Sequence, residues 1–488
     1  AGCVTSLATV IRNLVTHCTL GEPNKPLNKH SCTIAHCTMR HQGVPVPRPI
    51  CLNWLVLVAA LLGACGGGGS SPGTVTEAAS PHKVTEYITP YSMIYNYAAA
   101  DLNNDGLEDV VVSGWMAMGP GYSGEVNPGS GTWSGHYNPK VMVKILLQQT
   151  DGNLQDATPQ WLIDSMIWGS NRVLIADLDG DGFKDVVLPG FQDTGNFAPV
   201  PSVVLWNTGT GFTRDDSTLS TPIWSHGGCL VDVNQDGKTD IVMGTGSGGV
   251  WRNLGNRRFA FDASIINNAG ASCASDRDAT SGRQIVVSGN HYSNDGMRDN
   301  MYLLGQDGAL LETRGLPGTE LALNTDDTAL LFTDIDLDGQ NDLLVTGIGN
   351  RRRRAYKNLG NWNFVDYSTA WLSQVDTQSY NQISTRYLAY GTQRFVFLSG
   401  GQADTVFQLS NQGLMPVRPS RFVDVVREVS DSLGFAYNAE GYQSGFVYLS
   451  PALGGIGLLT PVPINNVNCQ NTRFTEHCSA IHFYSAPY

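Results

Sequence analysis

Aspartates are concentrated in one short stretch of the chain that leads into an apolar run. Residues 176–190 read ADLDGDGFKDVVLPG, with acidic residues at Asp177, Asp179, Asp181 and Asp185. Carboxylates at alternate positions repel one another, whereas Ca²⁺ takes about six to eight oxygen ligands from a loop of this kind. Gly182 stands at position six, counted from Asp177, and permits the positive φ that a tight ligand loop needs. The spacing therefore predicts calcium binding.

The same register recurs in three other places. Each copy has acidic or amide side chains at positions one, three, five and nine, and a glycine at position six. Position seven shares no side-chain chemistry between the copies, so we expect its backbone carbonyl to be the ligand. Four polar turns would not explain four copies of one register, and we expect about four calcium sites. The expected ligand residues are Asp101, Asn103, Asp105, Leu107 and Asp109; Asp177, Asp179, Asp181, Phe183 and Asp185; Asp232, Asn234, Asp236, Lys238 and Asp240; and Asp334, Asp336, Asp338, Gln340 and Asp342.

The residues that follow each loop identify the kind of calcium motif. An EF-hand needs a glutamate at position twelve and a helix after it. Here position twelve lies inside a β-branched or apolar run and is Val112, Leu188, Met243 or Val345. Similar apolar runs precede the loops. The unit is therefore strand, calcium loop, strand, which excludes the EF-hand and the helical dockerin-type loop.

The spacing of these units predicts the fold. The loops start at residues 101, 177, 232 and 334, and the last gap is about twice the one before it. A degenerate copy at 275–289 keeps Asp276 and Asp278 but lacks the other acids, so we expect no calcium there. A sixth copy at 386–401 keeps the two strands and lacks the loop. Units of about 55 residues with four strands each are typical of a β-propeller.

On these motifs the chain resembles the FG-GAP/VCBS repeat family, the calcium-loop propellers that include the integrin α-subunit head. The resemblance covers roughly residues 90–415. It implies that each acidic loop joins the first and second strands of a blade and holds Ca²⁺ on one rim. Members of the family commonly have seven blades, of which six are readable here. We expect an all-β propeller over 83–418, with a seventh blade that combines residues 83–97 with part of the C-terminal segment.

The C-terminal segment, residues 419–488, departs from the repeat. Apolar residues in 421–434 recur at helical spacing, from Phe422 to Leu433, and Gly434 is placed to end the helix. The remainder is typical of short strands and turns. We therefore expect a small C-terminal appendage that contains one helix and strands that close the ring.

The N-terminal region predicts a lipid anchor. Residues 51–65 are apolar but too short to span a bilayer, and they end in Leu-Gly-Ala-Cys, which resembles a bacterial lipobox. We interpret 39–64 as a lipoprotein signal peptide, Cys65 as the acylated residue and 65–82 as a Gly/Ser tether. Gly66 rather than aspartate follows the cysteine, which favours an outer-membrane lipoprotein of a bacterial cell envelope; the membrane face stays open. Residues 1–38 have no evident role and are expected to be translated upstream sequence.

The net charge limits the possible partners, and the cysteines bear on the possible disulfides. The net charge is −13, and the expected ligand positions supply 14 of the 43 acidic residues, so nucleic-acid binding is disfavoured. Cys229 and Cys273 each stand three residues before the first loop aspartate of consecutive blades. They could form a disulfide or remain as buried thiols, and both alternatives stay open. Cys469 and Cys478 could close a C-terminal loop.

Catalytic motifs are few. The chain contains no His-Glu-x-x-His and no Gly-x-Ser-x-Gly. We therefore expect a binding or adhesion module for a protein or a glycan rather than an enzyme. The alternatives are a polysaccharide-processing, lyase-like propeller and a passive cell-envelope scaffold.

A candidate ligand site lies in the first unit, which is longer than its neighbours. Its surplus, residues 115–139, alternates aromatic residues with glycine, proline and serine. Exposed aromatics on adaptable loops suit sugar rings or a protein contact, whereas buried ones would plug the blade. The candidate residues are Trp115, Tyr122, Trp133, His136 and Tyr137.

Overall fold

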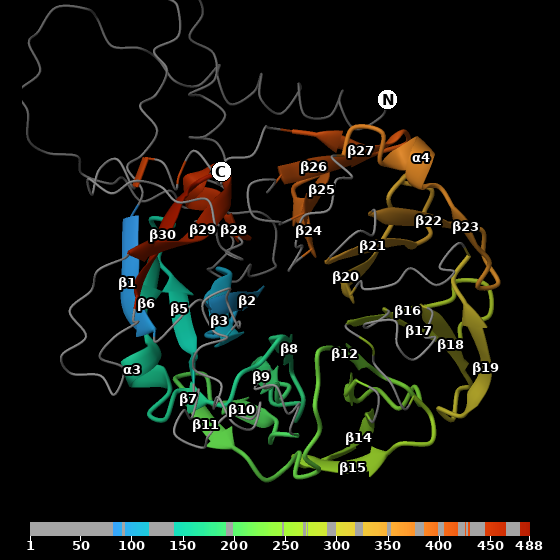
Figure 1. Cartoon of the computed structure of the whole chain (residues 1–488), viewed down its shortest axis with the longest axis horizontal. Helices are drawn as coiled ribbons and strands as arrows, with labels where there is room; N and C mark the ends of the chain where they lie inside the picture. The colour runs from blue at the N-terminus through green and yellow to red at the C-terminus, as the bar shows by residue number, and fades with distance from the viewer. Residues whose placement is uncertain are drawn as a thin grey trace, which may run out of the picture. The chain divides into compact units, whose positions relative to one another are not determined.

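Seven four-stranded antiparallel sheets are arranged in a ring, so the protein is an all-β, seven-bladed β-propeller with almost no helix (Figure 1). The prediction of this fold is confirmed. All described residues lie in the compact unit Val75–Tyr488. The computed structural model describes residues 82–89, 93–116, 141–191, 199–245, 248–266, 270, 272–289, 299–317, 326–348, 353–375, 385–398, 405–417, 425, 428–429, 445–464 and 479–488.

Each of the first six blades is a meander of four consecutive strands, read here from the centre of the ring outwards. Blades one to three are β2 (Met93–Ala100), β3 (Asp109–Met116), β5 (Lys144–Gln148) and β6 (Leu154–Asp156); β8 (Leu174–Ala176), β9 (Asp185–Leu188), β10 (Val203–Asn207) and β11 (Phe212–Asp215); and β12 (Gly228–Val231), β13 (Asp240–Met243), β14 (Gly249–Gly255) and β15 (Arg258–Asp262). Blades four to six are β16 (Cys273–Arg277), β17 (Gln284–Ser288), β18 (Asn300–Leu304) and β19 (Leu310–Gly315); β20 (Asp326–Thr333), β21 (Asp342–Ile348), β22 (Arg354–Asn358) and β23 (Phe364–Asp366); and β24 (Thr385–Tyr390), β25 (Gln393–Leu398), β26 (Thr405–Ser410) and β27 (Gly413–Pro416).

Short elements connect or flank the blades. They are the two-stranded sheet of β4 (Val141–Met142) and β7 (Met166–Ile167), the one-turn helices α3 (Thr158–Trp161) and α4 (Ser368–Trp371), and the 3₁₀ turn η4 (Pro451–Leu453). Within the described residues, no helix is long and apolar enough to cross a membrane.

The seventh blade joins the two ends of the described chain and closes the ring. Its strands are β28 (Phe446–Ser450), β29 (Gly455–Ile464), β30 (Ser479–Pro487) and, outermost, β1 (His82–Thr89). β1 pairs antiparallel with β30, from His82 opposite Ser485 to Thr89 opposite Ser479. The segment 83–97 is therefore divided between two blades, because β2 begins at Met93 and belongs to blade one. Most described C-terminal residues form the ring itself rather than an appendage to it.

The predicted helix over 421–434 lies mostly outside the described residues. Residues 425, 428 and 429 are helical. Val425 and Val429, one turn apart, are fully buried and pack against apolar residues of blades six and seven, including Phe397 and Leu458. Apolar residues at i and i+4 lie on one helix face, which explains why this pair is buried together.

The apolar runs after the loops are buried because each blade packs between two others. The second strands of blades one, two, three and five carry the runs Val110–Val112, Val186–Leu188, Ile241–Met243 and Leu343–Val345, all exposed by 1% or less. A strand that is covered on both faces has a continuous apolar sequence rather than an alternating one. Between blades two and three, for example, Trp206 and Trp251 lie in one apolar cluster with Met243.

A disulfide links the innermost strands of two neighbouring blades. Cys229 in β12 and Cys273 in β16 are joined, with their Cα atoms 5.4 Å apart. The structure therefore selects the first of the two alternatives that the sequence leaves open. Cys469 and Cys478 lie outside the described residues.

We expect this disulfide to stabilise the propeller because it restricts the unfolded chain across 44 residues. Replacing both cysteines, Cys229→Ala with Cys273→Ala, should lower the free energy of unfolding by about 2 to 4 kcal/mol. Urea unfolding without reductant measures the difference from the wild type. Equal unfolding midpoints for the two proteins would contradict the expectation.

Candidate metal centres

The four predicted loops lie at equivalent places in their blades. They connect β2 to β3, β8 to β9, β12 to β13 and β20 to β21, which are the innermost and second strands of blades one, two, three and five. Because each of these four blades is a meander that starts at the centre, the four loops lie at the same end of the ring. The family resemblance implies that each loop joins the first and second strands of its blade, and the four loops lie there in the structure.

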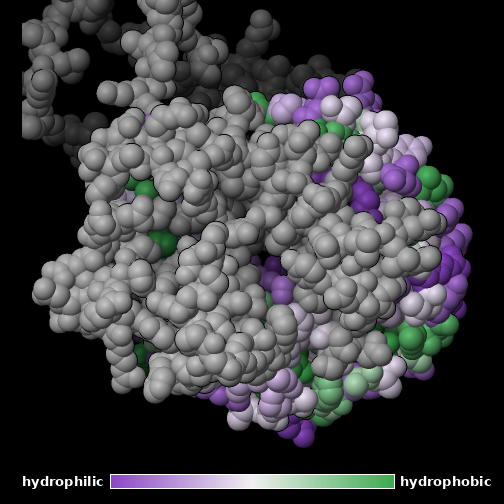
Figure 2. Space-filling model, in the orientation of Figure 1, coloured by the Kyte–Doolittle hydropathy of each residue, from purple (hydrophilic) through white to green (hydrophobic). Residues whose placement is uncertain are grey.

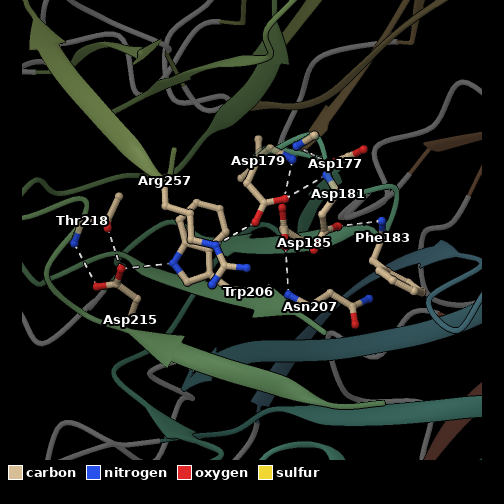
Figure 3. Close-up of polar contacts among 12 residues, drawn as sticks. Asp177, Asp179, Asp181, Phe183, Asp185, Trp206, Asn207, Asp215, Thr218 and Arg257 are labelled. Atoms are coloured by element: carbon tan, nitrogen blue, oxygen red, sulfur yellow. Dashed lines mark hydrogen bonds and ion pairs between the residues drawn. The ribbon is translucent and has the colours of Figure 1, made fainter. Parts of the chain in front are cut away.

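The aspartate at position nine connects each loop to the third strand of its blade. It is exposed by 1% or less in all four loops. One carboxylate oxygen accepts the backbone N–H of position two, and the other accepts an N–H at or near the end of the third strand. For Asp185 the donors are Leu178 at 2.9 Å and Asn207 at 2.8 Å, the latter drawn in Figure 3. The equivalent pairs of donors are Leu102 and Gln148 to Asp109, Val233 and Asn253 to Asp240, and Ile335 and Asn358 to Asp342.

The aspartates at positions one and five hold the tight turn. The two oxygens of Asp177 accept the N–H groups of Gly180 at 2.7 Å and Gly182 at 3.0 Å. Asp181 accepts the N–H of Phe183 at 2.9 Å. Short aspartate side chains that bind nearby backbone N–H groups in this way stabilise turns. The carboxylates therefore shape the loop whether or not they also hold a cation.

Two residues of each loop adopt positive φ. The glycine at position six does so in every loop, at 86°, 92°, 84° and 92° for Gly106, Gly182, Gly237 and Gly339. The residue at position four does so too, and only in blade two is it a glycine, Gly180. In the other loops it is Asn104, Gln235 and Leu337, with φ between 55° and 63°. Sequence reasoning missed position four because these residue types do not share a preference for that conformation.

Two of the loops bring three carboxylates close enough to bind one cation. Oxygens of Asp177, Asp179 and Asp185 lie within 4.8 Å of one another in blade two. The same is true of Asp334, Asp336 and Asp338 in blade five. The loops of blades one and three have one carboxylate fewer, since Asn103 and Asn234 occupy position three.

Position three also contains oxygens that lack a donor. Oδ1 of Asn234 in blade three and Oδ1 of Asp336 in blade five are buried without a hydrogen-bond partner. A buried acceptor that is left unsatisfied costs about 1 to 3 kcal/mol, and a bound cation would satisfy it. Hard oxygen donors of this type are those that Ca²⁺ prefers. The residues present therefore fit a calcium ion, which would supply positive charge among the carboxylates.

Basic side chains already offset part of the negative charge. In Figure 3, Arg257 reaches from the β14–β15 hairpin of blade three to the loop of blade two. Its Nε lies 2.7 Å from Oδ2 of Asp179, and its guanidinium carbon lies 4.9 Å from the Trp206 ring centroid. In blade five, Nζ of Lys357 contacts Asp336 and lies 2.6 Å from Oδ2 of Asp338. Sequence reasoning missed both cations, because each comes from a strand or hairpin distant in sequence from its loop.

Burial controls the protonation of the position-nine aspartates. Desolvation raises the pKa of Asp109 and of Asp342 to about 7, and the pKa of Asp185 and of Asp240 to about 6. The two backbone N–H donors lower the pKa in each case, whereas neighbouring loop carboxylates raise it. A nearby cation favours the ionised form of a carboxyl group. Metal binding to these loops would therefore release protons.

The degenerate loop of blade four uses its acids differently. Asp278 accepts the N–H groups of Ser281 at 2.7 Å and Trp362 at 3.2 Å. Asp276 accepts Nδ2 of Asn341 at 3.2 Å. Trp362 and Asn341 belong to blade five, so these carboxylates link two blades. The absence of calcium from this blade stays a prediction.

Several other predicted site residues cannot be placed. Trp115 lies at the end of β3, and its side chain is outside the described part of the chain. The remaining residues of the aromatic candidate, Tyr122, Trp133, His136 and Tyr137, and the lipidation residue Cys65 are also outside the described residues.

The two roles of the loop aspartates can be separated by substitution. Asp185→Ala should lower the free energy of unfolding by about 3 kcal/mol or more even in EGTA, because two buried N–H groups lose their acceptor. Asp181→Ala, at an exposed ligand position, should cost less than about 1 kcal/mol in EGTA and should lower only the additional stability that Ca²⁺ provides. Thermal and urea unfolding with EGTA or Ca²⁺ measure both effects. Equal losses for the two variants in EGTA would refute this division of roles.

Comparison with known proteins does not assign a family. No protein-family model matches the chain. No curated protein matches it either. Among solved structures, the V. cholerae biofilm matrix protein Bap1 aligns with a TM-score of 0.24 and 13% identity, over 86% of this chain and 69% of that chain. A thermostable family-43 glycoside hydrolase aligns with a TM-score of 0.24 and 9% identity, over 52% of this chain and 86% of that chain. At these scores neither likeness bears on function, and the fold is established by the seven sheets themselves.

Proposed function

We propose that this protein is a calcium-stabilised propeller of the FG-GAP/VCBS type that acts as a binding or adhesion module for a protein or a glycan. The observation that carries the proposal is one loop architecture repeated in four blades, with buried position-three oxygens that lack donors in two of them. Repetition of the same hydrogen-bond pattern at four places indicates selection for the loop, not a chance cluster of acids.

The hydrogen bonds between blades favour a structural role for the metal. Nδ2 of Asn207, in blade two, donates to the carbonyl of Leu102 in the loop of blade one at 2.8 Å. Nδ2 of Asn253, in blade three, donates to the carbonyl of Leu178 in the loop of blade two at 2.7 Å. A cation that orders one loop would therefore also order the position-two carbonyl that the next blade binds. Such coupling would stiffen this end of the ring.

A stiff propeller suits recognition, since binding residues are positioned best by rigid elements. The described loop carboxylates bind backbone N–H groups and basic side chains, which supports stabilisation over catalysis. The aromatic segment 115–139, which begins at the end of β3 away from the calcium loop, is the proposed contact region for the protein or glycan. The net charge of −13 argues against nucleic acid as the partner.

The binding function can be tested on an array of glycans and envelope proteins. Purified protein should bind at least one class of immobilised partner with Ca²⁺ and lose that binding in EGTA, because the propeller that presents the contact segment is less rigid without the metal. Asp181→Ala should weaken the same binding in part, whereas Asp216→Asn, a change at an exposed aspartate away from the loops, serves as the control. Failure to bind any partner, or binding that is indifferent to EGTA, would contradict a calcium-dependent binding module.

We further propose that Cys65 anchors the propeller to a bacterial outer membrane through acylation. Residues 39–64 have the features of a lipoprotein signal, and 65–82 would tether the ring. In cells that express the full chain, Cys65→Ser should abolish labelling with a fatty-acid probe and shift the protein from the membrane to the soluble fraction. Labelling that persists in this variant would end the proposal.

A further inference from the structure

The loop of blade five contains a cation supplied by the protein itself. Nζ of Lys357, on the third strand β22, contacts Oδ2 of Asp336 and lies 2.6 Å from Oδ2 of Asp338. Both acceptors belong to the group of three carboxylates in this loop, with Asp334 as the third. Ca²⁺ binds oxygen ligands at about 2.3 to 2.6 Å. The ammonium nitrogen therefore lies about as close to two of the expected ligands as a calcium ion would.

The surroundings of Lys357 hold its side chain in this place. The side chain is only 17% exposed. Its Nζ lies 5.6 Å from the ring centroid of Trp371, a buried residue of α4. An ammonium group at this distance is attracted to the face of an aromatic ring. Two carboxylates and one ring thus fix the lysine, and its contact with the loop is part of the fold.

The corresponding residues of the other calcium-loop blades do not place a charge among the ligands. Lys357 directly precedes Asn358, the third-strand donor to the position-nine aspartate. The residues that directly precede the equivalent donors in blades one, two and three are Leu147, Trp206 and Arg252. Leucine and tryptophan are uncharged, and Nε of Arg252 lies 3.8 Å from Oδ2 of Asp262 on β15, away from the loop. Among these four positions, Lys357 alone brings its charge into the loop.

The basic side chains at the loops of blades two and three bind one carboxylate each. Arg257 pairs with Asp179 of blade two, as drawn in Figure 3. Nζ of Lys238 lies 2.9 Å from Oδ2 of Asp236 in blade three, and both of these side chains are well exposed. A single exposed ion pair contributes little. These cations should therefore compete with a metal ion less than Lys357 does.

Solvent has access to the loop of blade five. Asp338 and Gly339 are exposed. Figure 2 shows hydrophilic residues interspersed with hydrophobic ones along the outer edge of blades four to six, on the right of the ring. A calcium ion could therefore approach this loop from water, and its binding would be limited by competition with Lys357 rather than by access.

We propose that Lys357 is the resident cation of blade five, which orders this loop without metal and confines tight calcium binding to blades one, two and three. Two positive charges at one position repel each other strongly, so Ca²⁺ would have to displace the ammonium. Oδ1 of Asp336 still lacks a donor, which leaves the loop a weaker affinity for the metal. The inference rests on the proposed calcium binding of the other three loops. Removal of calcium would then loosen blades one to three and leave blade five ordered.

The test is a calorimetric titration of the chelator-treated full chain with Ca²⁺ alone. Lys357→Met keeps the length and the apolar stem of the side chain and removes its charge. The wild type should have three tight sites and the variant four, the added site binding about tenfold or more tightly than blade five does in the wild type. The matched control is Arg252→Met, which removes the cation at the equivalent position of blade three and should keep three tight sites.

The number of sites in the wild type and the difference between the proteins answer separate questions. If Lys357→Met gains no site, or if Arg252→Met gains one equally, the role of Lys357 is overturned, however many ions the wild type binds. Four equally tight sites in the wild type overturn it as well. A wild type that binds no calcium would contradict the calcium-stabilised propeller, whereas one new site in Lys357→Met would still support the role of the lysine.

A second pair of variants keeps the lysine and covers the case in which Lys357→Met does not fold, as judged by circular dichroism. Asp338→Ala removes position five of blade five, and Asp181→Ala removes the same position of blade two. The first should leave the number of tight calcium sites unchanged, and the second should remove one. Loss of a tight site in Asp338→Ala, or the same number of tight sites in both variants, overturns the inference.

Discussion

The buried aspartate at position nine is the interaction on which the loop end of the propeller depends. Its two oxygens accept one N–H from the beginning of the loop and one from the end of the third strand. A single side chain thereby joins the loop to the third strand, although the second strand lies between them in the sequence. Hydrogen bonds to a charged group contribute about 1.5 to 3 kcal/mol each. The same arrangement in four blades explains why this carboxylate is more deeply buried than the others of the loop.

The position-nine carboxylate lies beside three further acidic or amide side chains, and the like charges among them repel one another. The chain offsets them with cations from other segments, Arg257 for blade two and Lys357 for blade five, and backbone N–H groups offset more. The buried oxygens without donors at position three show that this compensation is incomplete. A calcium ion would offset the remaining negative charge, and these oxygens are the ligand type that it prefers. The asparagine contacts join one loop to the next blade, and the disulfide joins the innermost strands of blades three and four.

Much of this architecture could be predicted from the sequence, because the loop register and the apolar runs repeat. The position of Asp177, Asp179, Asp181 and Asp185 between two strands follows from residue types alone. The seventh blade was harder to define, since β29 contains Gly455, Gly457, Pro461 and Pro463, which are unfavourable in strands. Contacts such as that of Arg257 with Asp179 could not be predicted, because they join residues 78 positions apart through tertiary structure. Position nine could be identified as a ligand candidate, but its role in joining the loop to the third strand depends on side-chain geometry that spacing does not encode.

The closing blade also determines how the ring responds to mechanical force. Any pull on the chain ahead of His82 acts first on β1, the outermost strand of blade seven, which among the described strands pairs only with β30. Hydrogen bonds between antiparallel strands lie perpendicular to the strands. A pull along β1 therefore loads all the pairs from His82 to Thr89 together, whereas a pull away from the sheet breaks them one after another, starting at His82. The force that the closing pairs withstand therefore depends on the direction in which the chain is pulled.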